Sequence, residues 1–220
     1  NRPNLDFRGY AGTVSSGRVK VGDDILVANS GRQSKIASLY VADTLSETAS
    51  AGEAVTITLA DELDIARGDV LSPPQARPEV ADQFTAHLIW MSADAMLPGR
   101  SYFLKLGAKT VPAQVTDLKH RIDVNTQEKL AAKTLQLNEI GLCNLATTMP
   151  IAFEPYALNH DLGAFILIDR RTNETAAAGV IEHGLRRATN VHRHGFAVTR
   201  EAHAALKHQK PAILWFTGLS

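Results

Sequence analysis

Short β-strand patterns separated by turn glycines fill the first third of the chain and limit what it can fold into. Five runs are rich in β-branched residues: 10–14, 18–20, 24–28, 35–41 and 54–59. In the last run the apolar side chains alternate, as in a strand with one buried face. Gly22 and Gly68 each precede an aspartate before a strand pattern, where glycine supplies positive φ at a tight corner. The pattern predicts a small β-barrel.

A proline-rich stretch follows this barrel and indicates a domain boundary. Residues 72–78 hold three prolines, which pair poorly in a sheet and stiffen a connection. Strand patterns then resume, with residues 97–100 as a turn, and they cover 84–91, 101–106, 111–118 and 141–146. Two further apolar runs, 164–169 and 178–181, flank the polar residues 170–175, as in a hairpin with a polar tip. We therefore expect a second barrel.

The pattern changes again after Gly184. Basic residues and histidines form a polar connection, and residues 199–208 have the composition of a short helix with Thr199 as a suitable N-cap. Residues 211–216 are a continuous apolar run, typical of a strand buried on both faces in a parallel sheet. The expected division is a barrel over 1–74, a second barrel over 79–184, and a linker with the start of an α/β domain over 185–220.

Charge, cysteine content and hydropathy narrow the function class. The chain has 23 Lys and Arg and 23 Asp and Glu, so no overall positive field would attract nucleic acid. Its single cysteine, Cys143, lies in an apolar stretch, which excludes a disulfide scaffold and indicates a buried thiol in a reducing compartment. No apolar run is long enough for a membrane helix. We expect a soluble, cytoplasmic segment of a longer polypeptide, since the chain starts without a methionine.

The end of the chain carries the sharpest chemical pattern. A buried strand that runs into Gly218, Leu219 and Ser220 resembles the start of a phosphate-binding loop, in which a first glycine turns the chain toward a phosphate cradle. The second glycine, the lysine and the Mg²⁺-binding hydroxyl of that motif do not follow. We therefore expect a truncated nucleotide site at these three residues and negligible nucleotide binding by the chain alone.

Other polar clusters admit a functional and a structural interpretation. His192 and His194 have the spacing of two metal ligands but lack nearby partners, so a linker pair is favoured and no metal is expected. His87 lies in an alternating strand, where we expect a satisfied or a surface imidazole. Residues 61–64 are read as a solvated acidic corner. Residues 119–121, a Lys-His-Arg cluster placed in a loop, are compatible with either anion binding or ordinary surface.

Several motifs together resemble a known family. Residues 2–23 resemble the second-domain barrel of translation-factor GTPases and, more closely, the GTPase subunit of bacterial sulfate adenylyltransferase. The finer assignment rests on residues 6–9 (DFRG), 97–102 (LPGRSY), 119–126 (KHRIDVNT), 137–141 (LNEIG) and 163–170 (GAFILIDR). Residues 209–220 (QKPAILWFTGLS) resemble the first strand and phosphate-loop start of adenylylsulfate kinase. The resemblance covers nearly the whole chain and indicates the bifunctional form.

The resemblance implies a role without a complete active site. A GTPase domain upstream would drive a separate catalytic subunit to form adenylylsulfate from ATP and sulfate, and a kinase downstream would phosphorylate it with Mg·ATP. The barrels would contact both the GTPase domain and the catalytic subunit, and residues 184–210 would tether the kinase. GTP, ATP and Mg²⁺ belong to the parent enzyme, and no cofactor is expected here. Two alternatives are an RNA- or ribosome-binding barrel pair and a small enzyme built on residues 183–208.

Overall fold

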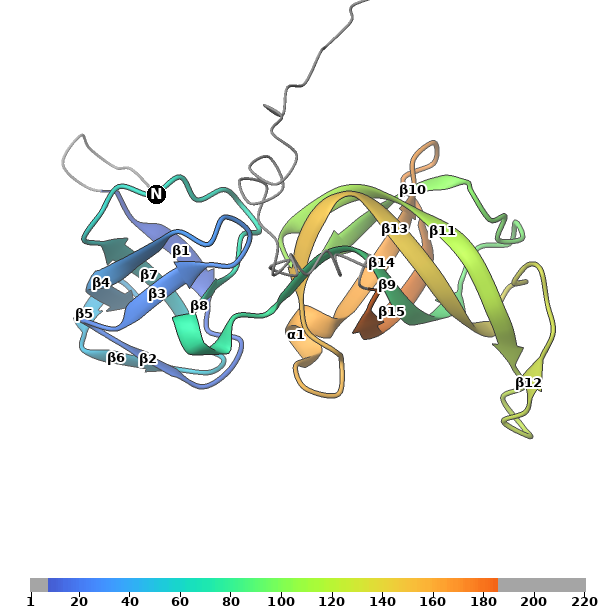
Figure 1. Ribbon diagram of the computed structural model, residues 1–220, viewed down its shortest axis with the longest axis horizontal. Helices are drawn as coiled ribbons and strands as arrows, with labels where there is room; N and C mark the ends of the chain where they lie inside the picture. Colours follow the sequence, from blue (N-terminus) through green and yellow to red (C-terminus); the bar gives the residue numbers. More distant parts are fainter. Residues whose placement is uncertain (1–7, 186–220) are drawn as a thin grey trace, which may run out of the picture. The chain divides into compact units, whose positions relative to one another are not determined.

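Eight short strands make up the first barrel in the computed structural model, which describes residues 8–185 (Figure 1). Their hydrogen-bonded order is β1-β7-β4-β3-β8, β5 pairs with β4, and β2 and β6 form a separate ribbon. The strands are β1 (Tyr10–Thr13), β2 (Arg18–Lys20), β3 (Asp24–Val27), β4 (Gln33–Val41), β5 (Thr44–Ser46), β6 (Thr48–Ser50), β7 (Ala54–Leu59) and β8 (Leu71–Ser72). All five strand patterns expected here correspond to observed strands.

Glycines form the corners of this barrel, as the sequence predicts. Gly22 has φ of 88° and Gly68 has φ of 85°, values at which a residue with a Cβ is strained. Each is followed by an aspartate whose carboxylate accepts a hydrogen bond from the backbone three residues earlier, at 2.9 Å for Asp23 with Lys20 and for Asp69 with Ala66. The Gly-Asp pairs are therefore structural turns.

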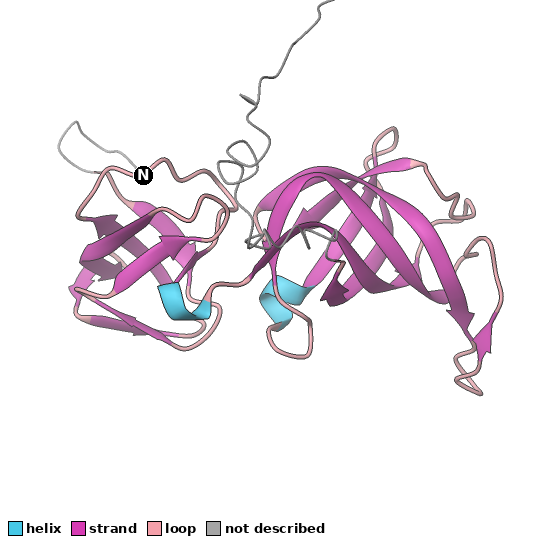
Figure 2. Ribbon diagram, in the orientation of Figure 1, coloured by secondary structure: helices cyan, strands magenta, loops and turns pink. Residues whose placement is uncertain are grey.

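The proline-rich connection is short and is held to the first barrel. It contains a single turn of 3₁₀ helix, η1 (Pro74–Ala76), one of the two short helices in the described part of the chain (Figure 2). Arg77 then donates from Nε to the carbonyl oxygen of Ala28 at 2.9 Å. This contact restrains the connection beyond the stiffness of its prolines.

The second barrel is a closed ring of six strands. The order runs β10-β14-β15-β9-β13-β11 and returns from β11 to β10, with β12 attached to β11. Its elements are β9 (Glu79–Trp90), β10 (Ser101–Leu106), β11 (Lys109–Ile122), β12 (Lys129–Leu130), β13 (Ile140–Phe153), α1 (His160–Gly163), β14 (Ala164–Asp169) and β15 (Thr175–Gly184). The expected mainly-β fold with two consecutive barrels is confirmed.

Large side chains fill the interior of the second barrel. Phe84 contacts Phe153 and Phe165 with ring centroids 5.4 and 5.8 Å apart, and Trp90 meets Tyr102 edge-on. Cys143 is fully buried in this core, as predicted, and burial raises the pKa of its thiol to about 12. Because these side chains occupy the inside, a partner has to meet the barrel from outside.

The structure corrects one sequence-based expectation and confirms another, and two more concern residues outside the described part of the chain. Residues 119–121 were expected in a loop, but they lie in β11, where pairing with β13 and β12 extends the strand to Ile122. The expected linker helix over 199–208 and kinase strand over 211–216 lie outside the described residues. The hairpin with a polar tip is present as β14 and β15, with Asn173 in a left-handed turn conformation at φ of 61°.

Candidate functional site

An apolar surface lies on the outside of the second barrel. Side chains alternate between the core and the exterior along a strand, so the exterior members can be read from the register. Two rows cross the strands: Ile140, Ile89, Ala178 and Ile166 in one, and Leu142, His87, Val180 and Ala164 in the other. We call the seven aliphatic residues of these rows the apolar face. Solvent is the ordinary neighbour of a barrel exterior, so seven aliphatic side chains together indicate a contact surface.

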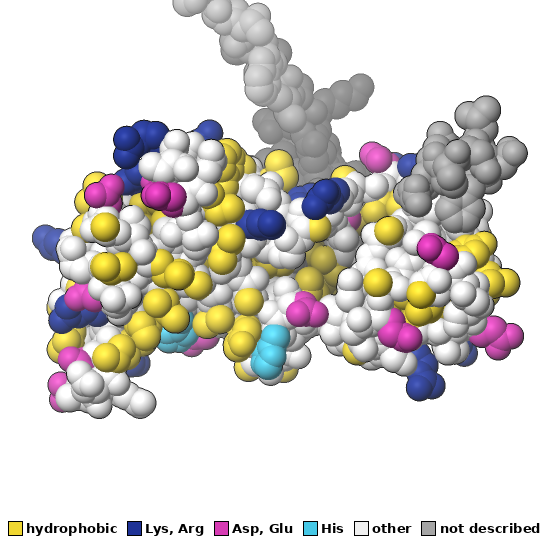
Figure 3. All heavy atoms as spheres, turned by 180° about the vertical axis from the view of Figure 1, so that it is seen from behind, with side chains coloured by type: hydrophobic (Ala, Val, Ile, Leu, Met, Phe, Trp, Pro, Cys, Tyr) yellow, Lys and Arg dark blue, Asp and Glu magenta, His cyan; other side chains and the backbone are white. Residues whose placement is uncertain are grey.

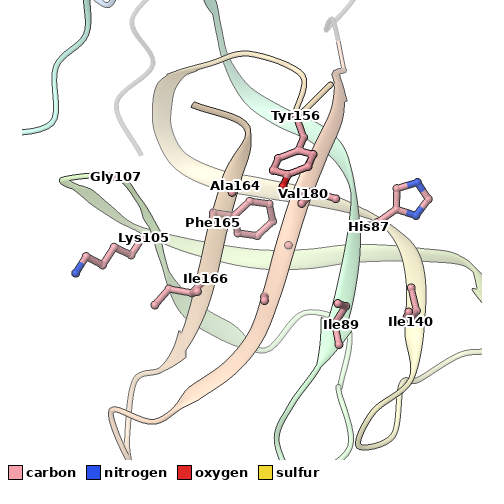
Figure 4. Close-up of a pocket in the computed structure, with 12 residues that line it drawn as sticks. His87, Ile89, Lys105, Gly107, Ile140, Tyr156, Ala164, Phe165, Ile166 and Val180 are labelled. Atoms are coloured by element: carbon pink, nitrogen blue, oxygen red, sulfur yellow. The ribbon is translucent and has the colours of Figure 1, made fainter. Parts of the chain in front are cut away.

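The apolar face is open and hollowed. Ile89 is 47% exposed and its six aliphatic companions are half-buried. A hollow of about 620 Å³ lies over it, bordered by Lys105 on one side and by Tyr156 and His87 on others (Figure 4). Seen from behind, hydrophobic side chains gather over the second barrel (Figure 3).

Small residues on β14 and β15 produce the hollow. Ala164 and Ala178 project little, and Gly179 has no Cβ; a methyl group there would lie 2.3 Å from Cζ of Phe165. The Phe165 ring therefore packs directly under β15, and β15 presents a shallow surface between Ile166 and Ile89. The site is formed by an alanine-glycine stretch flanked by branched aliphatic residues.

Two histidines and a glutamate border the apolar face. His87 and His120 lie on either side of Leu142 in one cross-strand row, and Nε2 of His87 is 3.8 Å from a carboxylate oxygen of Glu182. Burial, followed by the positive charge of Lys129, lowers the pKa of His120. The neutral form of the His120 imidazole is therefore favoured at this edge of the face.

A rigid loop stands beside the hollow. The Tyr156 N–H donates to Ile181 O at 2.9 Å, and the Tyr156 ring stacks on His160 with centroids 4.4 Å apart. Asn159 caps α1 by accepting from the N–H groups of Asp161 and Leu162. Leu158, at the tip, is 77% exposed. The loop therefore displays apolar side chains in a fixed conformation.

The polar clusters noted in the sequence are mostly satisfied within the barrels. In the corner at 61–64, Asp61 accepts from the Ser34 hydroxyl at 2.8 Å, and the carbonyl of the buried Leu63 accepts from Tyr10 Oη at 2.7 Å. In the 119–121 cluster, Arg121 pairs with Glu139. These contacts favour the structural interpretation of both clusters.

The polar groups of the hairpin tip at 170–175 also have partners within the barrel. Asp169 accepts hydrogen bonds from the N–H groups of Arg171 and Thr172 and forms an ion pair with Arg100. Those backbone hydrogen bonds, with Arg100 nearby, lower the pKa of Asp169. The tip is therefore a turn held by a carboxylate.

The described residues, 8–185, contain no candidate metal centre. Within that range no group of three His, Cys, Asp or Glu side chains could hold a metal ion. His87 is partly exposed and lies 3.8 Å from a carboxylate oxygen of Glu182, which agrees with the expected satisfied or surface imidazole. Gly218, Leu219 and Ser220, and the His192 and His194 pair, lie outside the described residues, so the expected truncated nucleotide site stays a prediction.

Sequence reasoning missed the apolar face, although a signal for it exists. Residues 164–168 read Ala-Phe-Ile-Leu-Ile and residues 178–181 read Ala-Gly-Val-Ile, so both faces of these strands are apolar. In an antiparallel barrel one face is normally solvated and polar. A strand without alternation therefore indicates that the outer side is covered too.

Two family models match the two barrels in order. Residues 10–72 match elongation factor Tu domain 2, and residues 83–182 match the GTP-eEF1A C-terminal domain-like family. A crystal structure of sup35 complexed with GDP superimposes with a TM-score of 0.74 at 20% identity, covering 81% of this chain and 44% of that one. The chain thus has the paired barrels of translation-factor GTPases.

The proteins most similar in sequence belong to a narrower class than the translation-factor GTPases. The bifunctional enzyme CysN/CysC of Xylella fastidiosa is 52% identical over all 220 residues, and the bifunctional enzyme NodQ of Azospirillum brasilense is 53% identical over the same length. Sulfate adenylyltransferase subunit 1 of Aeromonas salmonicida is 47% identical over 185 residues. The chain belongs to the family of these sulfate adenylyltransferase and bifunctional CysN/CysC-type enzymes. It spans 35 to 39% of the length of these three relatives.

The described helices were also compared with the length that a membrane-spanning helix requires. No helix within residues 8–185 is long and apolar enough to cross a bilayer.

Proposed function

We propose that this chain is the non-catalytic β-barrel segment of a sulfate-activating enzyme. In the parent protein an upstream GTPase domain acts on a separate sulfate adenylyltransferase catalytic subunit through the barrels, and a downstream adenylylsulfate kinase is tethered by the residues after β15. The enzyme converts sulfate to adenylylsulfate and then to 3′-phosphoadenylylsulfate in the cytoplasm. The names of the relatives, and the third of their length that the chain spans, support this proposal.

The observation that carries the proposal is the combination of a filled barrel interior and an apolar exterior. The second barrel has its core packed with aromatic side chains, and its outer rows expose aliphatic residues such as Ile89. A protein of this construction works by contact, because its interior has no room for a substrate and its surface favours burial. Transmission between domains requires such contact surfaces.

The proposal assigns a separate role to each part of the chain. Residues 1–74 and 79–184 are the two contact barrels, and residues 185–220 are the linker and the start of the kinase. Gly218, Leu219 and Ser220 begin the kinase phosphate loop. In this proposal GTP, ATP and Mg²⁺ are bound by the flanking domains of the parent enzyme.

A binding experiment tests this function. The purified chain is titrated with the sulfate adenylyltransferase catalytic subunit in a calorimeter, and saturable one-to-one binding is expected. A structured RNA is titrated in parallel as the probe for the alternative of an RNA- or ribosome-binding barrel pair. Binding of the RNA without the catalytic subunit would overturn the proposal in favour of that alternative. Binding of neither would remove the contact with the catalytic subunit from the proposal.

A further inference from the structure

The connection between the two barrels has no slack. Arg77 donates from Nε to the carbonyl oxygen of Ala28 in the first barrel at 2.9 Å, and Glu79, two residues later, already pairs with Phe153 in the second. Two residues span about 7 Å at most, and the ring of Pro78 between them fixes its φ. The connection therefore holds the barrels together at one place, although it leaves them free to turn about it.

A second attachment lies at the tip of the hairpin formed by β10 and β11. Gly68 of the first barrel lies against the backbone of Lys109, the first residue of β11. A Cβ added to Gly68 would be 2.7 Å from Cα and 2.7 Å from the backbone nitrogen of Lys109. Glycine is therefore required at this position twice, for its φ of 85° and for the approach of one barrel backbone to the other.

An ion pair reinforces this second attachment. Nζ of Lys109 lies 3.2 Å from Oδ1 of Asp69, and the two side chains are only 19% and 12% exposed. The other carboxylate oxygen of Asp69 accepts from the Ala66 N–H at 2.9 Å, which fixes the carboxylate on the first barrel. A pair with so little exposure is poorly screened by salt, and the loss of one member leaves the other charge without its partner. The pair therefore favours one orientation of the barrels.

A third attachment joins the start of α1 to the first barrel. Nδ2 of Asn159 lies 3.5 Å from the Ser15 hydroxyl oxygen, a long distance that marks a packing contact more than a strong hydrogen bond. Asn159 is only 6% exposed, and its Oδ1 is held by the N–H groups of Asp161 and Leu162, so its position is fixed. Domains joined by a short connection move relative to each other unless contacts prevent it, and three separate attachments are enough to do so. We call these three attachments the joint.

We propose that the two barrels move as one rigid body and that Lys109 is the positioning residue of the joint. A partner that touches both barrels then meets one preformed surface, and no freedom of motion between the barrels is lost when it binds. This inference goes beyond the proposed function. Its test requires neither the catalytic subunit nor a nucleotide, so the two can fail separately.

Distances between spin labels on the whole chain, measured by double electron–electron resonance, test the joint. Labels are attached at Gln33→Cys in β4 and Gln114→Cys in β11, two exposed strand positions in different barrels. Cys143 stays unlabelled because it is buried and its pKa is raised to about 12. A single narrow distance distribution is expected in the chain with Lys109 intact. Lys109→Glu places two carboxylates together and should widen the distribution about twofold or more.

Matched variants separate the joint from other effects. Lys35→Glu makes the same charge change in the Asp24–Lys35 pair, which lies within the first barrel and is about 60% exposed, so it should leave the distribution narrow. Lys109→Met and Asp69→Asn remove the ion pair without repulsion, and each should widen the distribution less than Lys109→Glu while circular dichroism shows both barrels folded. A broad distribution with Lys109 intact would overturn the rigid body. A distribution that none of the three joint variants changes, or that Lys35→Glu widens equally, would overturn the role of Lys109.

Discussion

Cys143 and His120 show how the surroundings of a side chain determine its protonation in this protein. Cys143 is interpretable from sequence because its neighbours are apolar, and the structure confirms a buried thiol with a raised pKa. His120 is different. Its sequence neighbours are Lys119 and Arg121, which suggest a charged cluster, whereas its cross-strand neighbour is Leu142. Only the strand pairing reveals that this imidazole borders an apolar face.

The pH behaviour of His120 follows from that position. We expect an NMR titration to place its pKa below the usual value of about 6.5, because burial and Lys129 both oppose protonation. Lys129→Gln should move the pKa upward without restoring it fully, since burial, the larger cause, remains. Because the folded pKa is the lower one, stability from this residue is present above about pH 6.5 and is lost on acidification through the pKa. Lys105→Gln serves as the control, and an equal upward shift there would contradict the assignment.

At the scale of elements, sequence reasoning found the main strands and misjudged their ends. The β9 pattern begins at Phe84 by hydrophobicity, but the strand begins at Glu79 because β13 supplies partners for the polar residues before it. The short strands β5, β6, β8 and β12 have two or three residues each, too few for a periodic signal. The apolar face was missed for a related reason: it is assembled from four strands, none of which contributes more than two of its residues.

The loop of residues 154–159 offers a test at this scale. Gly163 ends α1, and a Cβ there would lie 2.4 Å from the Tyr156 Cα and 2.9 Å from the Glu154 carbonyl oxygen. Backbone atoms cannot move aside as a side-chain tip can, so Gly163→Ala should lower stability by about 1–3 kcal/mol. Thermal unfolding monitored by circular dichroism would measure the change. Gly12→Ala, where no atom lies within 4 Å of the new Cβ, should be far milder; equal losses would refute the steric cause.

Across the whole molecule, the two barrels differ in how they hold together. The core of the second barrel is one continuous cluster, whereas that of the first is divided into two small ones around Ile36 and Leu39. The second ring closes by hydrogen bonds, and the first runs from β1 to β8. Larger continuous cores bury more apolar area per residue and are more stable.

This difference predicts unequal protection. Amide exchange of the full chain should show β1–β8 opening more often than β9–β15, because each unit opens with a free energy set by its own burial. Mild denaturant should widen the gap. Ile36→Ala is expected to speed exchange in the first barrel while leaving the second unchanged. Uniform exchange in both, before and after that substitution, would mean that the barrels unfold as one unit.

The first and last strands of the second barrel, β9 and β15, are antiparallel neighbours that close the ring, with Gly184 opposite Phe84. The chain thus enters and leaves at one seam, and a sequence appended after β15 breaks no hydrogen bond of the ring. A gene fusion at that seam is therefore structurally neutral for the barrel. The bifunctional relatives align with all 220 residues and sulfate adenylyltransferase subunit 1 with 185 of them. Such an architecture allows a lineage to add or lose a downstream domain in one genetic step.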